Sequence, residues 1–95
     1  MSLGGAATLV NETLTLADTE YFVSLSGCRR VMFKARTNVA VRYAFITGKV
    51  ATPTAPYMTL PAGAVYSDEY MGEFNGSVFL ACAVAGQVVE VEKWA

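Results

Sequence analysis

The stretch that decides the fold runs from Ser77 to Trp94 and reads SVFLACAVAGQVVEVEKW. Apolar residues alternate with small or charged ones on both sides of Ala85-Gly86, most clearly in Val89-Glu90-Val91-Glu92. Alternation with a period of two is typical of β-strands, and Ala-Gly supplies turn chemistry. The stretch therefore predicts two strands, over residues 77–84 and 87–94, that pair as a closing hairpin.

The same pattern extends toward the N-terminus, where turn residues interrupt alternating segments every 8 to 12 residues or so. The strands at 30–36 and 39–45 are separated by Thr37-Asn38 and should pair as a hairpin. Asn75-Gly76 is the strongest hairpin signal in the chain. Further strands are expected over residues 13–16, 21–25, 57–60 and 64–67, and the Pro- and Thr-rich segment 47–56 is expected to be the longest loop.

These segments predict an all-β fold, a single-domain antiparallel β-sandwich that is jelly-roll-like, with about seven to nine short strands. In a jelly roll the first and last strands often share a sheet, which would place Leu14 and Leu16 near Val89 and Val91. A small up-and-down β-barrel is the alternative. The 95 residues allow one domain. We assign it to residues 6–95 and interpret residues 1–5 as a disordered leader or an expression remnant.

The composition favours association with other chains. Hydrophobic residues make up 54% of the chain and charged residues 16%, against about 25% in typical proteins. Such an excess means that strands are buried on both faces or that a partner chain covers apolar surface, and the second reading favours a homo-oligomer. No apolar run approaches the roughly 20 residues of a membrane helix, so no membrane partner is expected.

Candidate catalytic and metal-binding chemistry is sparse. The chain has no histidine, which removes the commonest general base and transition-metal ligand. Cys28 and Cys82 are expected to be reduced thiols, with Cys82 in the core. The acidic cluster Asp68, Glu69 and Glu73 matches no calcium loop and is better explained as solvated. We therefore predict no catalytic residue, metal site or cofactor, and no enzymatic activity.

Charge is strongly segregated along the chain. No acid lies between Arg29 and Lys49, and Arg30, Lys34 and Arg36 share one face of the strand predicted at 30–36. This basic stripe has three open interpretations: a solvated face, an interface between identical subunits, or a nucleic-acid contact. The last is the least favoured because the cations are few. In the second, the stripe meets acids of a neighbouring copy, drawn from Asp68, Glu69, Glu73, Glu90 and Glu92.

The residues predicted for such an interface are Arg30, Lys34, Arg36, Arg42, Glu90, Glu92 and Trp94. Trp94 is expected either to close the bottom of the core or to lie in a subunit interface.

An alternative function, carbohydrate binding, would use the rings of Tyr57, Tyr66 and Tyr70 as stacking platforms.

The C-terminal part of the chain also resembles a family. Tyr57-Met58-Thr59-Leu60-Pro61-Ala62-Gly63, Asn75-Gly76-Ser77-Val78-Phe79-Leu80 and the segment from Ala85 to Trp94 resemble small β-rich structural proteins of tailed bacteriophages, and the run at 41–45 fits the same style. The resemblance implies a decoration, connector or fibre-associated subunit that works in a symmetric assembly, in the virion or the host cytoplasm. Its implied partners are copies of itself and other virion proteins. It assigns no functional residue.

Overall fold

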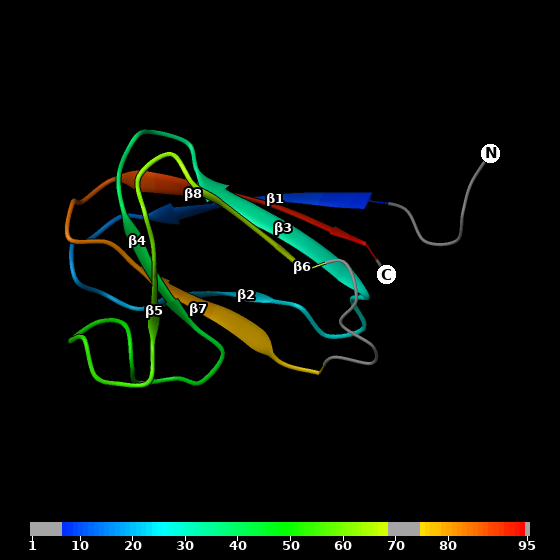
Figure 1. Cartoon of the computed structure of the whole chain (residues 1–95), viewed down its shortest axis with the longest axis horizontal. Helices are drawn as coiled ribbons and strands as arrows, with labels where there is room; N and C mark the ends of the chain where they lie inside the picture. Colours follow the sequence, from blue (N-terminus) through cyan, green and yellow to red (C-terminus); the bar gives the residue numbers. More distant parts are fainter. Residues whose placement is uncertain (1–6, 69–74, 95) are drawn as a thin grey trace.

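The computed structural model describes residues 7–68 and 75–94, which form two facing β-sheets (Figure 1). The alternation of the sequence places one side of each strand against the partner sheet. In chain order the strands of the described residues are β1 (Ala7–Leu14), β2 (Tyr21–Ser24), β3 (Arg30–Ala35), β4 (Val41–Ala44), β5 (Met58–Leu60), β6 (Val65–Asp68), β7 (Ser77–Ala81) and β8 (Gln87–Trp94).

Each sheet has four antiparallel strands. Sheet A has the order β1-β8-β3-β6, and sheet B has the order β2-β7-β4-β5. The chain therefore crosses between sheets at nearly every connection, which is the topology of a jelly roll. The predicted β-sandwich is confirmed, and the up-and-down barrel is excluded because strands that follow each other along the chain mostly lie in opposite sheets.

The first and last strands pair in sheet A as predicted. Val10 lies opposite Val91, and Leu14 lies opposite Gln87. The first strand, however, begins earlier than the sequence suggested and ends at Leu14. Leu16 lies beyond it and is 60% exposed, because the chain already turns toward Asp18, whose φ is 50°. The expected position of Leu16 beside the last strand is therefore wrong.

The predicted hairpins are also wrong. β3 pairs with β6 and β8, whereas β4 pairs with β5 and β7. β7 and β8 likewise lie in opposite sheets, and so do β6 and β7, which flank Asn75-Gly76. The turn at Gly86 (φ 79°) links two sheets across the core instead of two neighbouring strands. Alternation identifies the buried face of a strand but not its neighbour, since a strand can bury that face from either sheet.

The core lies between the sheets and contains Phe33, Leu80 and Val91 among its fully or nearly fully buried side chains. Cys28 and Cys82 are both buried free thiols, and Cys82 Sγ lies 3.4 Å from the carbonyl oxygen of Ala40. The rings of Phe33 and Tyr43 meet edge to face at 5.4 Å between centroids. Cys82 thus lies in the core, as its alternation with Leu80 predicted.

A second, smaller cluster lies on the outer side of sheet B. Val50, from the long connection between β4 and β5, is fully buried against Ala44 and Ala81, with Tyr57 and Phe79 beside them. The segment predicted to be the longest loop is therefore folded onto the sheet. The β4–β5 connection thus covers apolar surface of sheet B, which explains part of the apolar excess of the sequence without a partner chain.

Replacing Phe33, the largest fully buried side chain, should test this core. We expect Phe33→Ala to lower the free energy of unfolding by about 3–5 kcal/mol, because it removes a buried ring and leaves a cavity. Phe22→Ala is the matched control, since Phe22 is 60% exposed, and should cost less than about 1 kcal/mol. Urea denaturation measures both, and equal losses would contradict the assignment of Phe33 to the core.

Candidate functional site

The outer face of sheet A brings together most of the residues predicted for an interface. Because β8 lies between β1 and β3, its outward residues stand beside the outward residues of both strands. Lys34 lies opposite Glu90, Met32 opposite Glu92, and Arg30 opposite Trp94. On the other side of β8, Leu9 lies opposite Glu92 and Asn11 opposite Glu90. An acidic row on β8 therefore runs beside a basic row on β3.

Glu90 is the centre of the charge pairs on this face. Its carboxylate oxygens lie 3.3 Å from Lys34 Nζ and 3.0 Å from Arg36 Nε, and Arg36 donates a hydrogen bond through Nε. The hydrogen bond from Arg36, and then that from Lys34, lower the pKa of Glu90 below its ordinary value of 4.5. These cations therefore have an acid partner on their own chain, whereas the interface interpretation of the sequence placed that partner on a neighbouring copy.

Trp94 lies at the end of β8 against Arg30. The guanidinium carbon of Arg30 lies 4.4 Å from the centroid of the indole ring, within the range of a cation–π contact. The backbone also holds this end, since the amide of Arg29 donates to the carbonyl of Trp94 at 2.8 Å. Trp94 is half-buried on the outer face of sheet A, so it does not close the bottom of the core.

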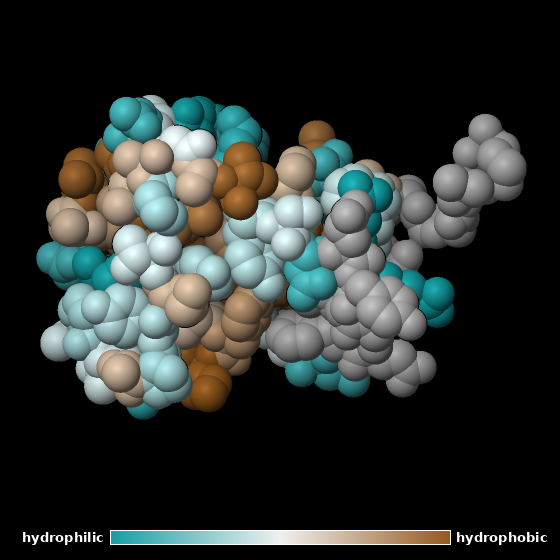
Figure 2. All heavy atoms as spheres, in the orientation of Figure 1, coloured by the Kyte–Doolittle hydropathy of each residue, from teal (hydrophilic) through white to brown (hydrophobic). Residues whose placement is uncertain are grey.

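A shallow groove of about 230 Å³ runs along this face. Its walls combine apolar, polar and charged residues, which are Leu9, Asn11, Met32, Phe33, Lys34, Glu90, Val91 and Glu92. Leu9 is 73% exposed, and Val65 on β6 is 50% exposed. Figure 2 shows, from one side of the molecule, hydrophobic residues reaching the surface at separate places among hydrophilic ones. The sequence analysis missed Leu9 and Asn11 because adjacent Leu9 and Val10 obscure the alternation of β1.

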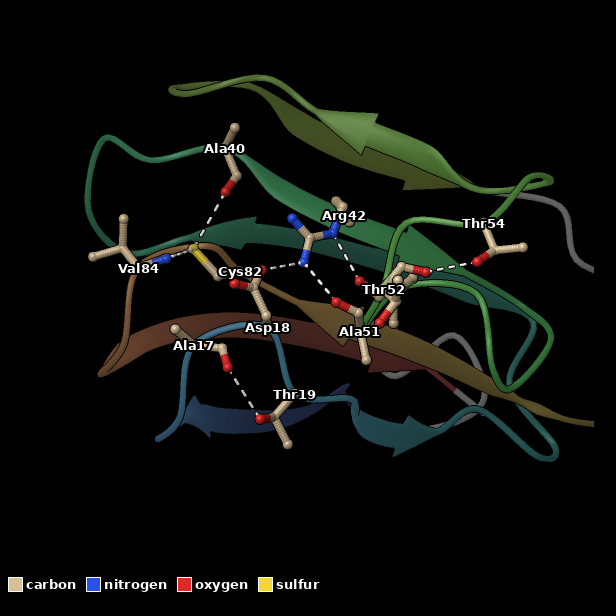
Figure 3. A network of polar contacts seen from close by, with 11 residues as sticks. Ala17, Asp18, Thr19, Ala40, Arg42, Ala51, Thr52, Thr54, Cys82 and Val84 are labelled. Atoms are coloured by element: carbon tan, nitrogen blue, oxygen red, sulfur yellow. Dashed lines mark hydrogen bonds and ion pairs between the residues drawn. The ribbon is translucent and has the colours of Figure 1, made fainter.

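Arg42 has a different environment from the other predicted interface residues. It belongs to β4 in sheet B, and its side chain is only 15% exposed. It donates to the carbonyl of Val50 at 2.7 Å. It also donates to the carbonyl of Ala51 at 3.3 Å and lies 2.7 Å from Asp18 Oδ1 (Figure 3). These contacts hold the β4–β5 connection against sheet B. The cations between Arg29 and Lys49 are therefore divided between two sheets, and Arg42 has its acid within the chain.

An apolar pocket of about 260 Å³ lies beside β4 and β5. Its lining is Tyr43, Ala44, Phe45, Ile46, Pro56, Tyr57 and Met58. Of the tyrosines predicted to bind sugar, Tyr57 lines it. Tyr66 instead stacks on Phe33 at 4.7 Å, and burial, followed by the charge of Asp68, raises its pKa. Tyr70 lies outside the described residues.

The acidic cluster is described only at Asp68, on β6, because Glu69 and Glu73 lie outside the described residues. Within residues 7–68 and 75–94, no group of three metal-ligating side chains is present. No helix in this part of the chain is long and apolar enough to cross a membrane.

Comparisons with known proteins bear on the fold alone. No protein-family model matches the chain, and no curated protein matches it. Among solved structures, the chain is similar to a de novo designed double-stranded β-helix determined by solution NMR, with a TM-score of 0.56 and 16% identity. The match covers 95% of this chain and 99% of that one. It supports the two-sheet β architecture, and at this identity it carries no information on activity.

The charge pairs of Glu90 predict a pH dependence of stability. Folding lowers the pKa of Glu90, so its contribution is present above the ordinary value of 4.5 and is lost as the pH falls through the folded value. We expect Glu90→Gln to be less stable than the native chain at about pH 7, with a smaller difference at about pH 3. Urea midpoints at both pH values measure it. A difference that persists unchanged in acid would exclude the charge pairs as its cause.

The contacts of Arg42 predict that Arg42→Lys loosens the β4–β5 connection. Lysine keeps the charge near Asp18 but cannot reproduce the fork that reaches both carbonyls, so we expect a loss of about 1–3 kcal/mol and faster amide exchange around Val50. Asp18→Asn is the control. Asparagine tolerates the positive φ of this position, and an ion pair whose acid is 58% exposed contributes little, so its loss should be smaller. Equal amide exchange rates around Val50 in Arg42→Lys and in the native chain would contradict the conclusion that Arg42 holds the β4–β5 connection against sheet B.

Proposed function

We propose that this chain is a non-enzymatic structural or assembly subunit of a virus particle, and that it acts by associating with copies of itself. The observation that carries the proposal is the outer face of sheet A, where an acidic row, a basic row and exposed apolar side chains share one surface. Two-sheet jelly rolls occur in viral capsid proteins, and in lectins and cupins as well, so the fold permits this function without specifying it.

The charges of this face suit self-association. Glu90 and Glu92 lie on β8, and Arg30 and Lys34 lie on the adjacent β3. A two-fold axis presents the same patch on both subunits, so a rotated copy can place its basic row over the acidic row of the first. Glu92 has no ion-pair partner among the described residues and is available to a cation of that copy. Such complementarity selects register and partner.

The outer face of sheet A also carries apolar side chains that association could bury. Leu9, Met32 and Val65 lie on the strands that flank or form the charged rows. Interfaces of this kind combine apolar contacts with a polar, partly solvated rim. Arg30 and Trp94 add two of the three residue types that contribute most at such surfaces. These residues would contact the second copy, and other virion proteins remain further proposed partners.

Carbohydrate binding is the second candidate. The aromatic walls of the apolar pocket, with Tyr57 among them, are the observation that favours it. Its weakness is the nearly apolar lining, because sugar hydroxyls need polar partners in a site. Binding to a glycan array above background, lost in Tyr57→Ala, would favour this candidate over assembly.

Light scattering tests the assembly proposal. At micromolar concentration and low salt, we expect the native chain to form a dimer or larger species that weakens at high salt, because salt screens the charged rows. Glu92→Lys should reduce association, since it places a cation opposite the basic row of the second copy. Thr59→Lys, at an exposed position of β5 in sheet B, is the control and should associate normally.

A strict monomer at both low and high salt would overturn the proposal of self-association. The virion assignment has its own criterion, the gene neighbourhood. Genes for terminase, portal or tail proteins should lie beside this one, and a setting among unrelated metabolic genes would contradict it.

A further inference from the structure

β1 is an open edge of sheet A. All of its residues, from Ala7 to Leu14, pair with β8 on one side. Its other side ends the sheet, and no strand of the described residues pairs there. Backbone N–H and C=O groups on such an edge can pair with another strand of matching length.

The other edges of the two sheets are shorter than β1. β2 and β6 have four residues each and β5 has three, whereas β1 has eight. Natural edge strands are usually protected by short length, lysine, proline or a bulge. The segment ATLVNETL contains no lysine, arginine, proline or glycine, and its register against β8 runs without a bulge. Its one charged residue is Glu12. β1 therefore lacks the usual protection against strand pairing.

We propose that β1 pairs antiparallel with β1 of a second copy, which joins the two four-stranded sheets A into one continuous sheet. An antiparallel edge can pair with itself about a two-fold axis, so the same strand serves both subunits. This inference rests on the proposed self-association but uses a different surface, the edge of sheet A and not its outer face.

The side chains of β1 favour one of the two registers that are centred on the strand. Facing residues must lie on the same side of the continuous sheet, because a slip of one residue exchanges the buried and solvent faces. With Val10 on the two-fold axis, the half-buried Val10 meets Val10 of the second copy, and Thr8 meets Glu12 of the second copy. With Asn11 on the axis, Val10 would face Glu12. The first register extends the apolar row and gives Glu12 a hydroxyl partner.

Substitution of Thr8 tests the pairing and its register. Thr8→Glu places a carboxylate opposite Glu12 of the second copy at two equivalent positions, so we expect the dimer to weaken by about 2-fold to 30-fold. Thr8→Lys makes the same change in length with the opposite charge and should keep or strengthen the dimer. Sedimentation equilibrium of the full chain measures both. Equal dissociation constants for the two variants would overturn the proposed register.

A cysteine at the two-fold axis tests the geometry directly. Directly opposite residues of an antiparallel pair have Cα atoms about 4.5–5.5 Å apart, which a disulfide can span. Val10→Cys should therefore form a covalent dimer under mild oxidation. Thr13→Cys is more exposed, but its copies would lie about 20 Å apart and should not cross-link. Equal cross-linking of the two variants, or none in Val10→Cys, would overturn the pairing.

The two proposals fail in distinguishable ways. If the chain associates and Glu92→Lys dissociates it while the β1 variants behave as the native chain, edge pairing is wrong and assembly through the outer face stands. If only the β1 variants change association, the edge pairing stands and the outer face is not the interface. If the native chain stays monomeric, and an added peptide of another sequence protects the β1 amides from hydrogen exchange, both the outer-face proposal and the β1 pairing are overturned.

Discussion

The pairing of β8 with both β1 and β3 is the constraint on which sheet A depends. Val89 and Val91 must face the core, so Glu90 and Glu92 must face outward. The same rule acts on β3, where Val31 and Phe33 are buried and Lys34 is exposed. Burial on one side of the sheet therefore orders the charges on the other. The acidic and basic rows are a consequence of packing the core.

The faces of the strands could be predicted from the sequence, but their neighbours could not. Alternation separated Val89 and Val91 from Glu90 and Glu92 and placed Cys82 in the core, because burial has the same period as the strand. It could not show that β7 and β8 lie in different sheets. Ala85-Gly86 supplies a turn in either case, and the choice between a hairpin and a crossing depends on long-range pairing with β1 and β2. Local turn chemistry carries no information about that pairing.

The candidate site was predicted in part for the same reason. Arg30, Lys34, Glu90, Glu92 and Trp94 lie together on the outer face of sheet A because even-numbered residues of β3 and β8 point the same way. Arg42 was grouped with them on the assumption of a β3–β4 hairpin, and the crossing places it in the opposite sheet. Its contacts with Val50 and Asp18 join residues 8 and 24 positions away, and no local pattern marks such contacts.

The cover that Val50 and its neighbours form on sheet B makes the two outer surfaces of the domain unlike. No connection among residues 7–68 and 75–94 covers the outer face of sheet A along β8, whereas the centre of sheet B is occupied by the chain's own β4–β5 connection. Copies that meet through sheet A would turn their covered sheets outward. Growth perpendicular to the sheets would then stop at a double layer, so the thickness of an assembly would be limited by the single connection that Arg42 holds in place.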